Sequence, residues 1–147
     1  MSSTRRARIE RLLAVRTRAL DVARAALGSA CRERVKATVA RDLAERAWEE
    51  RAQLLMTVSS LTMDALALAH AHLGGLRRRA DHEAATLLDA QRREGVALQA
   101  CMEANREVKK MEIWKDRLAE LERAEENRRE RIITDEVAAR TFARAGA

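Results

Sequence analysis

The side chains that most often hold metals or carry out catalysis are few in this chain and poorly spaced for either task. Only three histidines (His70, His72 and His82) and two cysteines (Cys31 and Cys101) are present. His70 and His72 are two residues apart, so on a helix they point to different faces. No cysteine or carboxylate stands beside them at a metal-binding spacing. The sequence therefore predicts no metal site and no disulfide framework, and reduced thiols in a cytoplasmic protein are the simplest interpretation.

No residue set typical of an enzyme is visible either. The chain has no glycine-rich phosphate loop and no GxSxG motif, and its many Asp and Glu residues alternate with Arg. On exposed helices such residues mostly form i,i+4 ion pairs. The stretch "LRRRAD" could contact phosphate, but three arginines in a row are more typical of a solvated face. We therefore predict a protein that is not an enzyme and takes no cofactor and no small-molecule substrate.

The composition favours long helices over a compact globule. Ala, Arg, Glu and Leu dominate, charged residues make up 35% of the chain, and there is no proline and no tyrosine. These residues are good helix formers, whereas the β-branched and aromatic residues of strands are scarce. Such compositions are typical of long helices and coiled coils. We predict an all-α fold in a single elongated domain. The formal net charge of +6 is spread along the chain, which argues against a concentrated nucleic-acid patch.

Apolar residues follow helical spacing in two charged zones, on either side of a zone with little charge. From about Thr4 to Arg51 the steps change from 7 to 4, which predicts a stutter in a coiled coil. The low-charge zone, residues 52–76, carries one charge, Asp64. From Arg77 onward a thin a/d-like stripe is typical of a weak coiled coil. The residues expected to face a partner helix are Ile9, Leu13, Leu20, Leu27, Cys31, Val35, Val39, Leu43 and Ala47, then Leu87, Leu98, Cys101, Asn105, Val108, Met111, Trp114, Leu118 and Leu121.

The adjacent glycines Gly74 and Gly75 predict where the chain reverses. A break there leaves two helices, about 4–73 and 76–145, each roughly 100 Å long at 1.5 Å per residue. Folding back covers each apolar stripe with the other, giving an antiparallel two-helix coiled-coil hairpin with a central turn at 74–75. The predicted neighbours are Leu118 with Cys31, Val35 with Trp114, Trp48 with Cys101, and Leu12 with Val137. One kinked helix that pairs only in a homodimer is the alternative.

The low-charge zone is expected to leave an apolar patch exposed. One thin partner helix cannot cover all its leucines, valines and methionines, and exposed patches of this kind are docking sites or oligomer seams. We expect Leu55, Val58, Leu61 and Leu66 to carry the contact. A small local core is the alternative. The zone is long enough for a transmembrane span, but Asp64 at its centre disfavours one.

The C-terminal stretch "KKMEIWKDRLAELERAEENRRERIITDEVAARTF" resembles the closing segment of the type III secretion and flagellar export stalk family, the FliJ, YscO and HrpO-type proteins. The pattern is E-x-R-R-E followed by D-E-x-A, and it is carried by Glu126, Arg128, Arg129, Glu130, Asp135, Glu136 and Ala138. The N-terminal "IERLLAVRTRALDVARAALGSA" is similar to the opening helix of that family. Ile132 and Ile133 depart from the pattern, because the family more often has polar residues there.

The resemblance implies a cytoplasmic, non-enzymatic two-helix stalk, peripheral to the secretion apparatus at the inner membrane. Members insert their paired terminal ends into the pore of a hexameric export ATPase, and the middle of the rod reaches toward the export-gate membrane protein. Some members bind secretion chaperones. On this basis we expect contact with the ATPase at Arg5, Arg6, Arg8, Arg128, Arg129 and Arg131. The alternatives are a coiled-coil scaffold or homo-oligomerisation module, a basic nucleic-acid-binding helical protein, and a membrane-anchored coiled coil.

Overall fold

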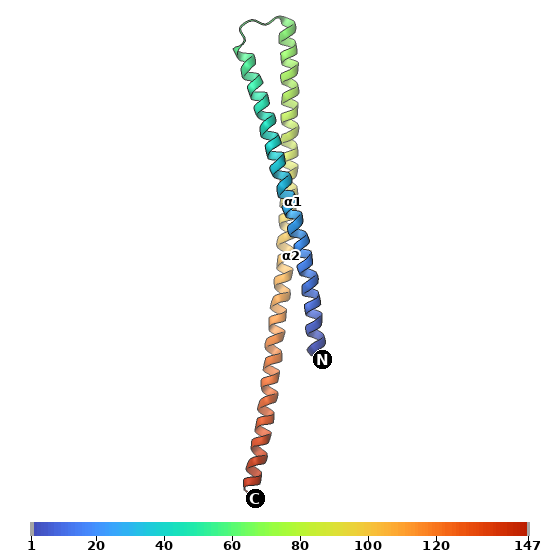
Figure 1. The fold of residues 1–147 in the computed structure, drawn as a ribbon, viewed down its shortest axis with the longest axis vertical. Coiled ribbons are helices and arrows are strands. Elements are labelled where there is room, and N and C mark those ends of the chain that lie inside the picture. The colour runs from blue at the N-terminus through green and yellow to red at the C-terminus, as the bar shows by residue number, and fades with distance from the viewer. Residues whose placement is uncertain (1, 147) are drawn as a thin grey trace. The chain divides into compact units, whose positions relative to one another are not determined.

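Two long helices joined by a short loop make up the part of the chain that the structure describes. The computed structural model describes residues 2–146, with side chains from Thr4 onward. Helix α1 spans Ser2–Thr57 (56 residues) and α2 spans Met63–Ala145 (83 residues) (Figure 1). Within residues 2–146 there is no strand. The predicted all-α helical hairpin is thereby confirmed.

The chain reverses in the loop at residues 58–62, where the sequence offers weak helix formers and a good cap. The loop reads Val-Ser-Ser-Leu-Thr, and Ser and Thr side chains compete for backbone hydrogen bonds. Thr62 is the N-cap of α2, because its Oγ1 accepts a hydrogen bond of 3.2 Å from the Ala65 amide. Asp64 in the first turn of α2 is favourably placed at the positive end of the helix dipole.

Gly74 and Gly75 lie inside α2, so the predicted turn at 74–75 and the predicted helices 4–73 and 76–145 are wrong. Each glycine costs about 1 kcal/mol relative to alanine in a helix, which is not enough to break a helix that contacts α1 close to them, through Arg77. Neither glycine has a positive φ. A Cβ at either position would meet only the Arg78 side chain, at 3.6 Å from Gly74 and 3.9 Å from Gly75. The space around them therefore does not require glycine.

The chain divides into two compact units, each built from one stretch of α1 and one of α2. Unit 2 is Asp21–Met102 and contains the loop with the helix on either side of it. Unit 1 combines α1 up to Leu20 with α2 from Glu103 onward. Within each unit the two helices run antiparallel (Figure 1). Neither helix contains, in its described residues, an apolar stretch that would cross a lipid bilayer.

Small side chains form the seam between the helices of unit 2. The buried residues of this unit are Ala37, Ala44, Ala80, Leu87 and Ala90, and three of them (Ala37, Leu87 and Ala90) form one cluster. Ala37 and Ala44 are seven residues apart, as are Ala80 and Leu87, which is the heptad spacing of a coiled coil. Alanine at these positions lets two helices approach closely, although each side chain buries little apolar area.

The residues expected to continue the α1 stripe at steps of four point to solvent. Val35, Val39 and Leu43 are 51%, 53% and 61% exposed. The seam follows the heptad of Ala37 and Ala44 instead, so the predicted stutter is wrong for this stretch. The hydropathy pattern predicted Val35, Val39 and Leu43 as seam residues because alanine is only weakly apolar and barely differs in hydropathy from its neighbours.

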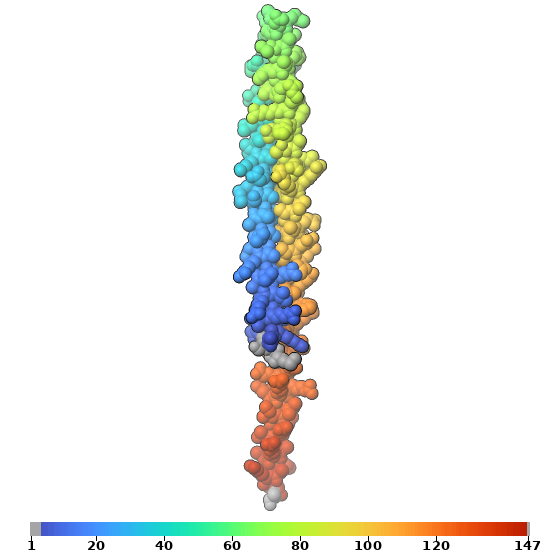
Figure 2. All heavy atoms as spheres, turned by 90° about the vertical axis from the view of Figure 1, so that its right-hand side faces the viewer, coloured from blue at the N-terminus to red at the C-terminus, as the bar shows by residue number. Residues whose placement is uncertain are grey.

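Unit 1 is paired along only part of its α2 stretch. Leu20 and Val108 are buried, and Ile9, Leu13 and Leu118 are half-buried. From residue 123 to residue 146 every side chain is exposed. Figure 2 shows this last stretch, coloured orange to red, running on with no second helix beside it. We call residues 123–145 the C-terminal extension.

Candidate interaction surfaces

The six arginines predicted to contact an ATPase are all exposed, three near the start of α1 and three on the C-terminal extension. Two of them are paired within their own helix. Arg6 Nε lies 3.5 Å from Glu10 Oε1, and Arg129 Nη2 lies 3.9 Å from Glu125 Oε2. Exposed pairs of this kind are worth only about 0–1 kcal/mol, so the guanidinium groups remain free to exchange partners.

The start of α1 lies beside the middle of unit 1's α2 stretch and not beside its end. Arg6 and Ile9 line a shallow hollow together with Lys115, Leu118 and Glu122. Leu118 therefore packs near Ile9, and its predicted neighbour Cys31 lies instead against Glu94 in unit 2. The predicted pairing of Leu12 with Val137 is also wrong, because Val137 lies in a stretch where every side chain is exposed and nearby Ile9 of α1 lies beside Leu118. The earlier reversal of the chain shifts the register and leaves the last part of α2 without a partner.

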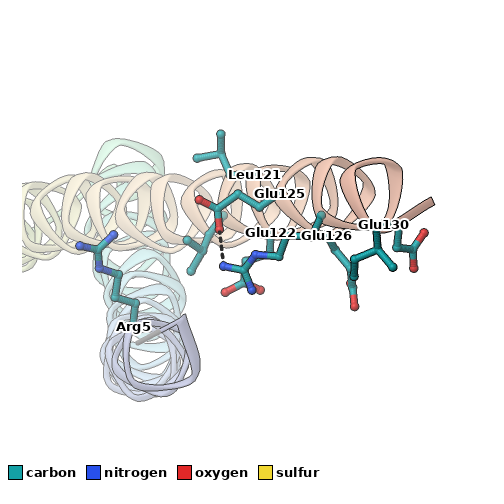
Figure 3. A pocket seen from close by; sticks show the side chains of 9 residues that line it. Arg5, Leu121, Glu122, Glu125, Glu126 and Glu130 are labelled. Atoms are coloured by element: carbon teal, nitrogen blue, oxygen red, sulfur yellow. Dashed lines mark ion pairs between the residues drawn. The ribbon is translucent and has the colours of Figure 1, made fainter. Parts of the chain in front are cut away.

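A groove opens where the start of α1 meets α2, and we call it the extension groove. Figure 3 shows Arg5 entering from α1, while glutamates project from consecutive turns of α2. Its lining residues are Arg5, Leu118, Leu121, Glu122, Glu125, Glu126, Arg129, Glu130 and Ile133. Of the predicted arginines only Arg5 and Arg129 line it. The groove combines three apolar side chains with four carboxylates.

A second groove lies at the loop end of unit 2, and we call it the loop groove. The two helices diverge toward the loop in Figure 1. Its lining residues are Arg51, Leu54, Leu55, Val58, Leu61, Ala65, Leu68, Ala69 and His72. The structure thus brings together three of the residues predicted for a second partner, whereas Leu66 is half-buried and not part of the lining. The low-charge zone packs partly on itself across the loop.

Polar side chains connect the two helices of unit 2 at two levels of the seam. Glu94 accepts a hydrogen bond from Cys31 Sγ (3.1 Å), and its other oxygen lies 2.6 Å from Arg34 Nε. The hydrogen bond to Glu94 raises the pKa of the Cys31 thiol, with smaller contributions from burial and from the negative charge of Glu94. A thiol held in this way is a poorer nucleophile than a free cysteine.

At the second level, Arg77 of α2 contacts Trp48 of α1, for which another neighbour was predicted. Arg77 Nη1 lies 3.3 Å from Glu45 Oε1, Arg77 Nε lies 3.2 Å from Asp81, and the guanidinium lies 4.9 Å from the centroid of the Trp48 ring. The prediction that Trp48 lies near Cys101 is therefore wrong. Charged side chains that bridge two helices at one fixed level are a common means of setting coiled-coil register.

The match to a protein family decides the identity of the chain. The sequence pattern of the family described as "Flagellar FliJ protein" matches residues 5–147. The chain belongs to the FliJ family. Neither a curated protein nor a solved structure gives a match. The resemblance to the export stalk family, inferred from both ends of the sequence, is confirmed.

Membership of the FliJ family makes the chain a coiled-coil component of a flagellar or type III protein export apparatus. The match covers both grooves and all six exposed arginines. Sequence reasoning missed the carboxylate face of the extension groove, because it treated the Glu residues as partners of Arg along an exposed helix. The signal that could have found this face is the spacing of Glu122, Glu126 and Glu130 at steps of four, with Glu125 three residues after Glu122. Among the described residues, no three His, Cys, Asp or Glu side chains converge as a metal site.

Proposed function

We propose that this FliJ-family chain is the central stalk of the export apparatus, a single elongated element that is cytoplasmic and peripheral to the machinery at the inner membrane. One end binds the hexameric export ATPase, and the other end binds the export-gate membrane protein. Secretion chaperones are further partners. The observation that carries the proposal is the family match over residues 5–147, together with a charged surface in unit 1 and an apolar groove in unit 2.

The charged end suits contact with an ATPase pore. All six arginines are exposed, and those that are paired at all are paired weakly within their own helix. Many polar contacts of low individual strength hold a helix in a pore while still allowing it to turn or shift. In the described structure the C-terminal extension has no partner helix, so Arg128, Arg129 and Arg131 on it are available to a surrounding ring.

The loop groove is suited to bind a second partner more tightly than the exposed charged contacts bind the ATPase. Its walls are mostly leucine, alanine and valine, and the neighbouring Met56 and Met63 are 87% and 80% exposed. An exposed apolar surface of this kind marks a protein interaction site. Because Leu55, Val58 and Leu61 line the groove from α1 and the loop, we assign them the contact with the export gate. Leu66 does not line the groove, so this assignment leaves it out.

The ATPase contact is tested with the purified chain and its cognate export ATPase. Adding the chain should raise both the hexamer fraction, measured by mass photometry, and the rate of ATP hydrolysis. The double variant Arg128→Glu/Arg131→Glu should lose most of this effect. Arg46→Glu/Arg92→Glu is the matched control, because it makes the same charge change at two exposed arginines of unit 2. No change in hexamer fraction or turnover with the wild-type chain would contradict the proposal.

A coiled-coil scaffold that self-assembles is the second candidate, and the exposed loop groove is the observation that favours it. Two or more copies could cover Leu54, Met56 and Leu68 by packing loop ends together. Light scattering separates the two functions. A stable monomer supports the stalk, whereas a tight trimer or larger species supports the scaffold.

A further inference from the structure

The face of α2 that holds the start of α1 continues beyond it with nothing packed on it. Leu118 and Glu122 contact the α1 side of unit 1, near Arg6 and Ile9. The same two residues begin the extension groove, which then follows α2 as far as Ile133. The lining residues of α2 alternate at steps of three and one, so they spread over about half of the helix circumference, from Leu121 at one border to Glu130 at the other. The groove is therefore the continuation of an established helix-helix interface.

The chemistry of this face specifies its occupant. The groove carries Glu122, Glu125, Glu126 and Glu130 around an apolar floor, and Arg129 is the only basic residue that α2 contributes. The floor is accessible, since Leu121 and Ile133 are 65% and 60% exposed. These two side chains lie about 18 Å apart along the axis, at 1.5 Å per residue. A helix of at least three turns can cover both of them.

The start of α1 shows what kind of helix this face accepts. That segment is basic, with Arg5, Arg6 and Arg8, and it sets Ile9 against α2 beside Leu118. Arg5 already reaches the rim of the groove (Figure 3). A second copy of the same face is a poor occupant, because it would place carboxylates against carboxylates.

We propose that the extension groove is a docking site for a basic amphipathic helix of a partner protein, which lies on α2 in line with α1. Its apolar residues cover Leu121 and Ile133, and flanking Lys or Arg side chains pair with the four glutamates. The groove shares Arg5 and Arg129 with the proposed ATPase contact, whereas Arg128 and Arg131 do not line it. Variants of Arg128 and Arg131 therefore test the ATPase contact, and variants of the groove glutamates test the docking site, on different side chains.

The test uses the full chain and two synthetic peptides of about six helical turns that share one leucine pattern. One peptide carries lysines beside the leucines, and the other carries glutamates at the same positions. The lysine peptide should bind at physiological salt by fluorescence anisotropy and shift the NMR signals of Leu121 and Ile133. Absence of binding by the lysine peptide, or equal binding by the glutamate peptide, would overturn the proposal.

Charge-reversal variants locate the site. Glu125→Lys/Glu126→Lys should weaken binding of the lysine peptide by about tenfold, since two exposed charge contacts become repulsive. Glu120→Lys/Asp135→Lys is the matched control, because it makes the same charge change on the same helix at exposed residues outside the groove. Equal loss in both variants would show attraction to overall charge only and would contradict the site. Self-association of the chain that the lysine peptide disrupts would also contradict it, because a second copy would then be the occupant.

Discussion

The seam of unit 2 and the C-terminal extension use the same helix in opposite ways. Both belong to α2 and both are rich in Arg and Glu. Ala80, Leu87 and Ala90 are buried against α1, whereas Ile132 and Ile133 are exposed along with everything around them. Helix formation thus follows composition in both regions, but burial occurs only where α1 runs alongside. Apolar side chains are buried in the seam, whereas the extension exposes its apolar and charged side chains.

Hydrogen exchange should give the largest contrast between the two regions. Seam amides of α2 near Leu87 and Ala90 exchange only when the helix pair opens, whereas an unpaired helix of about 20 residues is marginal in water. We expect amides in residues 126–145 to exchange about a thousandfold faster than seam amides. Mass spectrometry of the isolated chain measures this. Equal protection would mean that another helix, from a second copy, already covers the extension.

Leucine-to-alanine substitutions compare a buried and an exposed position of α2 through the free energy of unfolding. Leu87 is 9% exposed and the adjacent Leu88 is 50% exposed, so the two offer the same chemical change in different surroundings. Leu87→Ala should lower the free energy of unfolding by about 2–4 kcal/mol, since a buried leucine leaves a cavity. Leu88→Ala should cost less than about 1 kcal/mol. Urea denaturation followed by circular dichroism measures both. Similar losses would show that Leu88 is also covered in solution.

Most of the fold could be predicted from composition, because long-range packing adds little to a chain of good helix formers. The position of the turn could not. Two glycines suggested a break at 74–75, but α2 carries them at a cost of about 2 kcal/mol, while Thr62 and the preceding serines provide a cap and a true interruption. Since the turn sets where each helix pairs, this one difference changed the neighbours of Leu118, Cys31 and Trp48 and created the unpaired extension.

The candidate surfaces were predictable to different degrees. The loop groove follows from a local signal, the near absence of charge in residues 52–76, and three of its predicted residues do line it. The seam was hidden because alanines such as Ala37 occupy heptad positions, and because Glu94 sits at a seam position paired with Arg34. A hydropathy pattern detects neither the small seam alanines nor the paired glutamate. The extension groove depends on where α1 begins along α2, which spacing within one helix does not specify.

The smallest expected effect concerns Glu107, which lies in the paired part of unit 1 near Arg16 of α1. Its pKa is lowered from 4.5, chiefly because Lys110 Nζ donates a hydrogen bond of 2.7 Å to it, while partial burial acts in the opposite direction. A carboxyl whose folded-state pKa is depressed stabilises the fold fully above the unfolded-state value of 4.5. That contribution is lost as the pH falls through the folded-state pKa.

NMR titration of the Glu107 carboxyl carbon separates two contributions to its pKa, that of Lys110 on the same helix and that of Arg16 on α1. Lys110→Gln should raise the pKa of Glu107 toward 4.5, whereas Lys109→Gln, a change at the neighbouring lysine, should leave it in place. Arg16→Gln should raise the pKa by a smaller amount, because its attraction is the weakest of the causes that lower it. An unchanged pKa in the Arg16 variant would mean that α1 does not lie close to this turn of α2. The pairing that distinguishes this part of α2 from the C-terminal extension would then end before residue 107.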